Sequence, residues 1–232
     1  MLKFISKSRL IRPIARFIHK IWMDYRCGVV VYYDDPERAR VIKLVRQVKG
    51  EVDLLLGDNE GYTIYRTVIN TSKIKGDIAE VGTYKGGSSK IICEAKGRKT
   101  LHLFDTFEGL PELSKLYDTR LVQKGDYAAS LIEIKRYLKG FKGVHFYKGL
   151  FPSTSGPVKN KKFSFVNLDV DIYESTLSGL RFFYPRMTRG GIIISHDYTS
   201  FRGVKKAVDE FFEDRVEPVV ELSGTQCLIV KI

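Results

Sequence analysis

Residues 76–89 combine a short apolar segment, a glycine-rich turn and the start of a helix, and this combination constrains the fold more than any other part of the chain. The apolar segment predicts a buried strand ending near Glu80, whose carboxylate could accept hydrogen bonds from a ligand amine or hydroxyl. The turn contains Gly82, Gly86 and Gly87. Glycines allow a sharp turn and the close approach of a ligand, and Ser88 and Ser89 are expected to cap the following helix. This order is typical of a nucleotide-type pocket at the first strand of an α/β sheet.

Apolar strands alternate with amphipathic helices along most of the chain. Strands are expected at about 77–81, 99–104, 144–147, 163–168, 191–195, 216–222 and 225–231. Helices are expected at about 34–49, 60–73, 85–96, 128–139, 173–184 and 202–214. The alternation predicts an α/β, doubly wound, mainly parallel seven-stranded sheet with helices on both faces. The turn at Ser223-Gly224 predicts that the last two strands form a C-terminal antiparallel hairpin.

Acidic residues end four of the predicted strands. They are Glu80, Asp105, Asp169 and Asp197, the last of which follows His196. The carboxyl ends of parallel strands meet at one edge of the sheet, which is where α/β proteins bind ligands. A single acid at such a position is most simply a helix cap, but four together favour a ligand site.

Basic residues are concentrated at the N-terminus. The formal net charge is +12, and residues 1–26, with seven Lys or Arg and one Asp, carry half of it. Apolar residues recur there at helical spacing, so we expect residues 1–33 to form a basic amphipathic arm ahead of a domain over 34–232. The arm could lie on an anionic membrane surface or pack against a second subunit of a homodimer.

Several classes of protein are disfavoured. No apolar run reaches the length of a membrane span, and no helix-turn-helix, RNP-like strand or zinc finger points to nucleic acid. Cys27, Cys93 and Cys227 are scattered and form no CxxC pair. We therefore expect reduced thiols and a cytoplasmic protein, either free or peripheral on the inner face of the membrane.

A set of ordered motifs carries a family resemblance. The motifs are 76–82 with 86–88, 104–111, 125–127, 148–154, 168–176, 184–186 and 190–191. Together they cover about residues 60–215, and their order makes them much more specific than the glycine turn alone. On these motifs the chain resembles class I S-adenosylmethionine-dependent methyltransferases with a Rossmann-like fold. More narrowly, it resembles the macrocin O-methyltransferase family, which methylates sugar hydroxyls on natural products.

The resemblance implies a set of residues that bind the cofactor S-adenosylmethionine. Around its methionine end would lie Glu80, Gly82, Thr83, Tyr84, Gly86, Gly87 and Ser88. Asp105 would hold the ribose hydroxyls, an expectation shared with other α/β nucleotide pockets, and Thr106 and Phe107 would flank the ribose and adenine. Gly149 and Phe151 would line the adenine pocket. Asp126, in an inserted loop, is a weaker correspondence.

The resemblance also implies a divalent metal, usually magnesium, and a general base. Asp169 would be a metal ligand and Asp171 the base, with two further ligands at the end of the fifth strand. The family usually has Asp-Asp-Tyr there, but this chain has His196-Asp197-Tyr198. A His ligand suits manganese, iron or zinc as well as magnesium. Alternatively, His196 is a supporting donor or a packed core residue, and Asp171 caps the helix that begins near Tyr173.

The chemistry expected from these residues is transfer of the cofactor's methyl group to a hydroxyl of a sugar or glycosylated acceptor. The metal would lower the pKa of the hydroxyl, and Asp171 would accept its proton. The acceptor could be a small molecule or a lipid-linked or surface-polysaccharide sugar, and the long loop 106–127 could cover it. The alternatives are a methyltransferase-fold enzyme with another small-molecule acceptor and no metal, and a non-catalytic cofactor-binding protein docked on a membrane.

Overall fold

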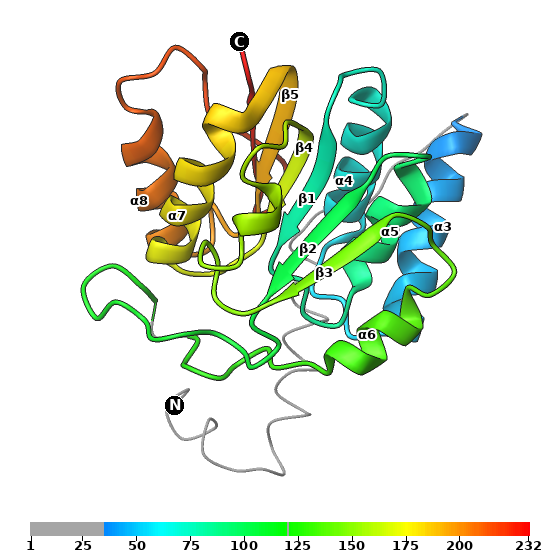
Figure 1. Ribbon diagram of the computed structural model, residues 1–232, viewed down its shortest axis with the longest axis horizontal. Coiled ribbons are helices and arrows are strands. Elements are labelled where there is room, and N and C mark those ends of the chain that lie inside the picture. Colours follow the sequence, from blue (N-terminus) through cyan, green and yellow to red (C-terminus); the bar gives the residue numbers. More distant parts are fainter. Residues whose placement is uncertain (1–34, 120) are drawn as a thin grey trace.

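The computed structural model describes residues 35–119 and 121–232 (Figure 1). The predicted basic arm, residues 1–33, therefore lies outside the described residues, as does Cys27. No helix among the described residues is both long and apolar enough to cross a membrane.

Seven strands form one mixed sheet in the order β3-β2-β1-β4-β5-β7-β6. They are β1 (Asp77–Val81), β2 (Leu101–Asp105), β3 (Val144–Lys148), β4 (Phe163–Leu168), β5 (Met187–Ser195), β6 (Val220–Glu221) and β7 (Cys227–Val230). The first five are parallel, while β7 pairs antiparallel with both β5 and β6. The structure thus confirms the predicted fold class, including the C-terminal hairpin.

Helices cover both faces of this sheet. They are α3 (Pro36–Glu51), α4 (Asp58–Asn70), α5 (Gly87–Ala95), α6 (Leu131–Tyr137), α7 (Tyr173–Phe183) and α8 (Arg202–Phe212), with the short 3-10 turns η1 (Gly156–Val158) and η2 (Tyr184–Arg186). Figure 1 shows α7 and α8 on one side and α3, α4 and α5 on the other. Each side has its own apolar core, with Phe104, Val166 and Leu180 in the first and Ile78, Leu101 and Val45 in the second.

The chain reverses its direction of travel across the sheet between β1 and β4. From β1 it proceeds outward to β2 and β3, and then it returns to β4 on the other side of β1. Such a reversal opens a crevice beyond the carboxyl ends of the two central strands, where doubly wound proteins bind ligands. The topology therefore places the loops after β1 and β4 at the expected binding position.

Two boundaries differ clearly from those expected. β5 begins at Met187 rather than near 191, because Met187 already pairs with Phe163 of β4. β6 contains only two residues, whereas the strand was expected to span about 216–222. Pro218 precedes it and lacks the N–H group that a longer ladder would need.

Candidate functional site

Strained backbone is concentrated at the carboxyl edge of the sheet. Among the described residues, five other than glycine have positive φ: Tyr84 (46°), Phe107 (57°), Tyr127 (63°), Asp171 (61°) and Asp197 (58°). Four of them follow β1, β2, β4 and β5, and Tyr127 lies in the loop between β2 and α6. Left-handed backbone is costly for residues with a side chain, and it gathers at functional sites. This edge is therefore the candidate site.

The glycines after β1 are required by the packing of the chain itself. Gly82 has φ +87°, and a Cβ there would lie 1.6 Å from the carbonyl oxygen of Asp169. A Cβ on Gly86 would lie 3.1 Å from Ile134, and one on Gly87 would lie 2.8 Å from Leu54. The direction in which a Cβ would project from each of these glycines is thus occupied by protein atoms. Gly82 instead lets the residues that follow β1 lie close to those that follow β4.

Asp105 joins the loops that follow β1 and β2. Its carboxylate accepts backbone hydrogen bonds from Thr83 (2.6 Å), Tyr84 (2.9 Å) and Phe107 (2.6 Å). Burial raises the pKa of Asp105 above its ordinary value, and these three amides offset part of that rise. The predicted ribose acid therefore also organises the turn, and its contact with a ribose stays a prediction.

Glu80 lies inside the sheet rather than at its edge. Its side chain is fully buried and accepts hydrogen bonds from Ser89 Oγ and from Asn167 Nδ2, the latter at 3.0 Å. The expectation that Ser88 and Ser89 cap α5 was wrong, because Gly86 occupies the N-cap and Ser89 points to Glu80 instead. Burial, only partly offset by these donors, raises the pKa of Glu80 to about 7.

We expect the variant E80Q to become progressively more stable than the wild type as the pH rises. A carboxyl group whose pKa increases from 4.5 to about 7 on folding contributes stability below pH 4.5 and loses it as the pH rises through 7. Glutamine cannot ionise, so its advantage should be greater at pH 8.5 than at pH 5, by about 2–3 kcal/mol. Urea unfolding of the cofactor-free protein at both pH values measures this difference. E94Q, at an exposed position on α5, is the control, and an equal response of the two variants would contradict the prediction.

The ends of β4 and β5 bring the three predicted metal ligands together. His196 Nδ1 lies 2.8 Å from Asp197 Oδ2 and 3.3 Å from Asp169 Oδ1. One ligand atom from each of the three residues lies within 4.8 Å of the others. Ser200 Oγ donates a 2.6 Å hydrogen bond to the second oxygen of Asp197 and fixes that carboxylate.

The surroundings shift the pKa values of the residues in this group in different directions. Burial lowers the pKa of His196, but Asp197 and Asp169 raise it by more than burial lowers it. The pKa of His196 therefore lies well above its ordinary value. Burial and the two neighbouring aspartates raise the pKa of Asp171 well above its usual range. Burial alone would raise the pKa of Asp197 as well, but His196 and Ser200 lower it below its ordinary value. The two aspartates therefore favour the protonated form of His196.

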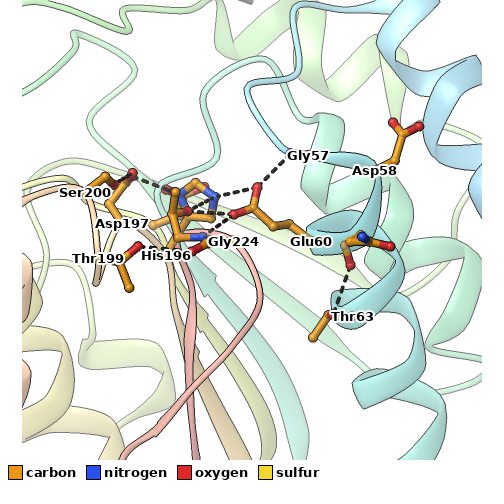
Figure 2. Close-up of polar contacts among 12 residues, drawn as sticks. Gly57, Asp58, Glu60, Thr63, His196, Asp197, Thr199, Ser200 and Gly224 are labelled. Carbon is orange, nitrogen blue, oxygen red and sulfur yellow. Dashed lines mark hydrogen bonds and ion pairs between the residues drawn. The ribbon is translucent and has the colours of Figure 1, made fainter. Parts of the chain in front are cut away.

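Glu60 is a member of this centre that the sequence interpretation missed. It is 1% exposed, lies in the first turn of α4 and accepts a 2.7 Å hydrogen bond from the amide of Gly57 (Figure 2). It accepts two more, also of 2.7 Å, from the amide and the hydroxyl of Thr225. Its carboxylate lies 3.5 Å from His196 Nε2. Burial raises the pKa of Glu60, but His196 and the amides reduce it to about 2. A carboxylate on Nε2 orients the ring so that Nδ1 faces Asp169 and Asp197.

Tyr127 also faces the acidic centre. Burial raises its pKa first, and the charges of Asp171 and Asp197 raise it further. Its ring meets that of Tyr84 edge-on, with the centroids 5.6 Å apart. The sequence motif at 125–127 could have indicated Tyr127, but the interpretation of the motif selected Asp126. The carboxylate of Asp126 accepts a hydrogen bond from the amide of Gln123 within a turn.

The residues expected around the adenine make internal contacts. Phe151 is 6% exposed and stacks on Phe183 at 5.2 Å within the core, and Phe107 is equally buried. Thr106 Oγ1 donates to the carbonyl of Gly109 at 2.7 Å. A Cβ on Gly149, where φ is +136°, would lie 2.8 Å from Thr154. These residues shape the loops after β2 and β3, and their contact with an adenine stays a prediction.

The loop 106–127 is tied to the two helices beneath it. Asp118 is buried and accepts a 2.8 Å hydrogen bond from the amide of Tyr173, the first residue of α7. Arg202 donates to the carbonyls of Leu116 and Asp118. Asp118 therefore performs the capping that was the alternative role of Asp171, whose side chain instead lies among the aspartates of the site.

Comparison with known proteins agrees with this geometry. A family model described as macrocin O-methyltransferase (TylF) matches residues 63–225. A tetracenomycin-derivative rhamnosyl 4'-O-methyltransferase of Streptomyces olivaceus is 28% identical over 188 residues, which are 72% of this chain and 70% of the relative. Demethyldecarbamoylnovobiocin O-methyltransferase of Streptomyces niveus is 26% identical over 155 residues, 60% of this chain and 59% of the relative.

Solved structures agree on the fold. The O-methyltransferase NovP superposes with a TM-score of 0.64 at 24% identity, covering 77% of this chain and 81% of NovP. The calicheamicin methyltransferase CalS11 superposes with a TM-score of 0.62 at 16% identity, covering 88% of this chain and 98% of CalS11. The sheet and its helices are thus those of known O-methyltransferases.

Proposed function

This chain belongs to the macrocin O-methyltransferase family of S-adenosylmethionine-dependent O-methyltransferases, and on that premise we propose that it methylates a sugar hydroxyl of a glycosylated small molecule. The observation that carries the proposal is the position of Asp171 beside Asp169, His196 and Asp197 at the carboxyl ends of β4 and β5. The names of the relatives, which include a rhamnosyl 4'-O-methyltransferase, support a sugar as the acceptor class.

Asp171 is the proposed general base. The hydroxyl oxygen attacks the methyl carbon of the sulfonium, the carbon–sulfur bond breaks, and the hydroxyl proton passes to Asp171. The products are the methyl ether and S-adenosylhomocysteine. Burial and, after it, the neighbouring aspartates raise the pKa of Asp171, which makes its carboxylate a stronger base than an ordinary aspartate. The protein otherwise contributes alignment of the oxygen, the methyl carbon and the sulfur.

The proposed cofactor site follows the loops after β1, β2 and β3. Gly86 is the N-cap of α5, whose first amides have no partner within the helix and can face an anionic group. Glu80 carries a carboxyl group beneath this turn, and Asp105 lies at the end of β2 beside it. These positions support the expected placement of the methionine end near β1 and of the ribose near β2.

The donor set fits a divalent metal, which Asp169, His196 and Asp197 would hold. Two carboxylates and one imidazole suit manganese or iron as well as magnesium. The metal would supply a positive charge that lowers the pKa of the acceptor hydroxyl. The Nδ1 proton of His196 must leave before that nitrogen can act as a ligand.

A metal-free mechanism is the second candidate, and one specific observation favours it. Asp197 and Asp169 raise the pKa of His196 and so favour its imidazolium form, whose positive charge would lie at the centre. In this alternative the imidazolium takes the electrostatic role of the metal, and Asp171 remains the base.

Calorimetry and a methyl-transfer assay test the proposed function. We expect S-adenosylmethionine to bind, and D105A to weaken that binding if Asp105 holds the ribose. With a rhamnosylated acceptor, a chelator should abolish transfer and leave cofactor binding unchanged if a metal is required. Full turnover in chelator would favour the imidazolium mechanism instead, and absence of cofactor binding by the wild type would contradict the proposed function.

Location and further contacts remain proposals of the same kind. We place the enzyme in the cytoplasm, and the net +6 of residues 1–26 supports contact of that segment with an anionic membrane surface. The alternative for this segment is packing against a second subunit of a homodimer.

A further inference from the structure

The edge of the sheet opposite the candidate site is unusually basic. Five segments lead into the parallel strands there, at 71–76, 96–100, 139–143, 159–162 and 184–190. The last comprises η2 and the first four residues of β5, and for brevity we call all five loops. Together they contain twelve Lys or Arg and no Asp or Glu, although the whole chain has 39 basic and 27 acidic residues. In Figure 1 the C-terminus and the start of β5 lie at this end, and the green loop between β2 and α6 lies at the other.

Cations hold neighbouring loops of this edge together. Lys99 Nζ donates to the carbonyls of Ile74 (2.6 Å) and Gly76 (2.8 Å) in the loop before β1. Lys96 Nζ donates to the carbonyl of Lys142 (2.6 Å) in the loop before β3. A carbonyl satisfies the ammonium hydrogens but adds no negative charge. The loops are therefore linked without any loss of positive charge.

The same kind of hydrogen bond joins the loops that lead into β4 and β5, the parallel strands on the other side of β1. Lys162 Nζ donates to the carbonyl of Pro185 at 3.2 Å, and Arg186 Nε donates to the carbonyl of Lys159 at 2.9 Å. The loops before β4 and β5 are thus joined in the same way. The amide of Asp77, next to the loop before β1, donates to the carbonyl of Lys162 at 2.8 Å and links the two groups of loops. We call the surface of these five loops the basic edge.

Nine cations of the basic edge are exposed. They are Lys73, Lys75, Arg98, Lys139, Lys142, Lys159, Lys161, Lys162 and Arg189. Within the described part of the chain, the one carboxylate ion pair among them joins Lys161 to Asp77, at 3.5 Å. The other eight face solvent without a carboxylate partner in that part of the structure.

We propose that the basic edge docks the enzyme on an anionic phospholipid surface. Seven of the nine exposed cations are lysines, which act as point charges toward phosphate headgroups and lack the planar fork that reads a base. The described parts of the five loops expose no aromatic ring on which a nucleobase could stack, since Phe141 and Tyr184 are both half-buried. The charge and the absence of stacking groups favour lipid over nucleic acid.

Docking in this way would turn the candidate site away from the membrane. The central strands are five or six residues long, so the two edges are roughly 17–20 Å apart along the strands. An acceptor would then be reached on the solution side, as a dissolved molecule or as a sugar that projects well beyond the headgroups. This docking does not depend on the identity of the acceptor or on a metal.

Vesicle binding by two charge-matched variants tests the proposal. The edge variant carries Lys73→Gln, Lys142→Gln and Lys159→Gln. The control carries Lys43→Gln, Lys135→Gln and Arg181→Gln on α3, α6 and α7, and all six side chains are exposed. Both variants lose three positive charges from the same full-length chain, so they differ in the position of the loss and not in its size.

We expect the wild type to sediment at low salt with vesicles of phosphatidylglycerol and phosphatidylcholine, and not with phosphatidylcholine alone. Each lysine near such a surface is worth about fivefold in binding, so the edge variant should bind on the order of 100-fold more weakly. The control should change by a few-fold at most. Equal losses in the two variants, no binding by the wild type, or a preference for RNA or DNA over the vesicles would overturn the proposal. Circular dichroism confirms that both variants are folded.

Discussion

Replacing Asp171 with asparagine is expected to lower kcat for methyl transfer by about 10²- to 10⁴-fold, because the amide cannot accept the hydroxyl proton. Binding of S-adenosylmethionine, measured by calorimetry, should change little. The backbone of Asp171 has φ +61°, a left-handed conformation that asparagine tolerates well. The substitution should therefore leave the local fold intact.

Stability provides the internal control for D171N. Burial, Asp197 and Asp169 raise the pKa of Asp171, so its contribution to stability is present at low pH and is lost as the pH rises through the folded-state value. Asparagine avoids that loss, so the variant should be at least as stable as the wild type at pH 8. The control is E174Q, at an exposed position in the first turn of α7, which should leave both kcat and the stability unchanged. A variant that keeps wild-type kcat would exclude Asp171 as the base.

Replacing Gly82 with alanine is expected to destabilise the fold by more than about 4 kcal/mol, in the range of severe backbone clashes. The new Cβ would lie 1.6 Å from the carbonyl oxygen of Asp169, and both neighbouring strands are central. Only a shift of β1 against β4 could relieve that contact. Urea unfolding monitored by circular dichroism measures the loss.

Gly97→Ala is the matched control for this clash. Gly97 also has positive φ, +58°, but its Cβ position has no atom within 4 Å. Its substitution tests the left-handed conformation alone, which costs about 1–2 kcal/mol. If both alanine variants lose the same stability, the contact between Gly82 and Asp169 is not what requires the glycine.

Local sequence patterns were sufficient for the elements of the fold. The strand at 77–81 has the predicted bounds and the helix after β4 begins at the predicted residue 173, because apolar segments and helical apolar spacing are properties of neighbouring residues. Strand-end acids at 169 and 197 could be expected at one edge, since parallel strands share their direction. The motifs also predicted the family that the comparisons show.

The partners of individual side chains could not be predicted in this way. Ser89 is in a suitable place for a helix cap, yet the tertiary structure turns its hydroxyl toward Glu80 on β1. Asp171 precedes a helix, yet the cap of that helix is supplied by Asp118 from a loop 55 residues away in the chain. In both cases the neighbouring sequence predicts one hydrogen-bond partner, and folding brings a different partner close.

Sequence patterns were enough to predict the α/β class, the parallel sheet, the family and the edge at which the strand-end acids gather. Only the folded structure revealed that Glu60 supports His196, since its main partner Thr225 is 165 residues away in the chain. It also decided that Gly82 serves a contact between strands. Periodicity is encoded in adjacent residues, whereas hydrogen bonds and close contacts between elements depend on the packing of the whole chain.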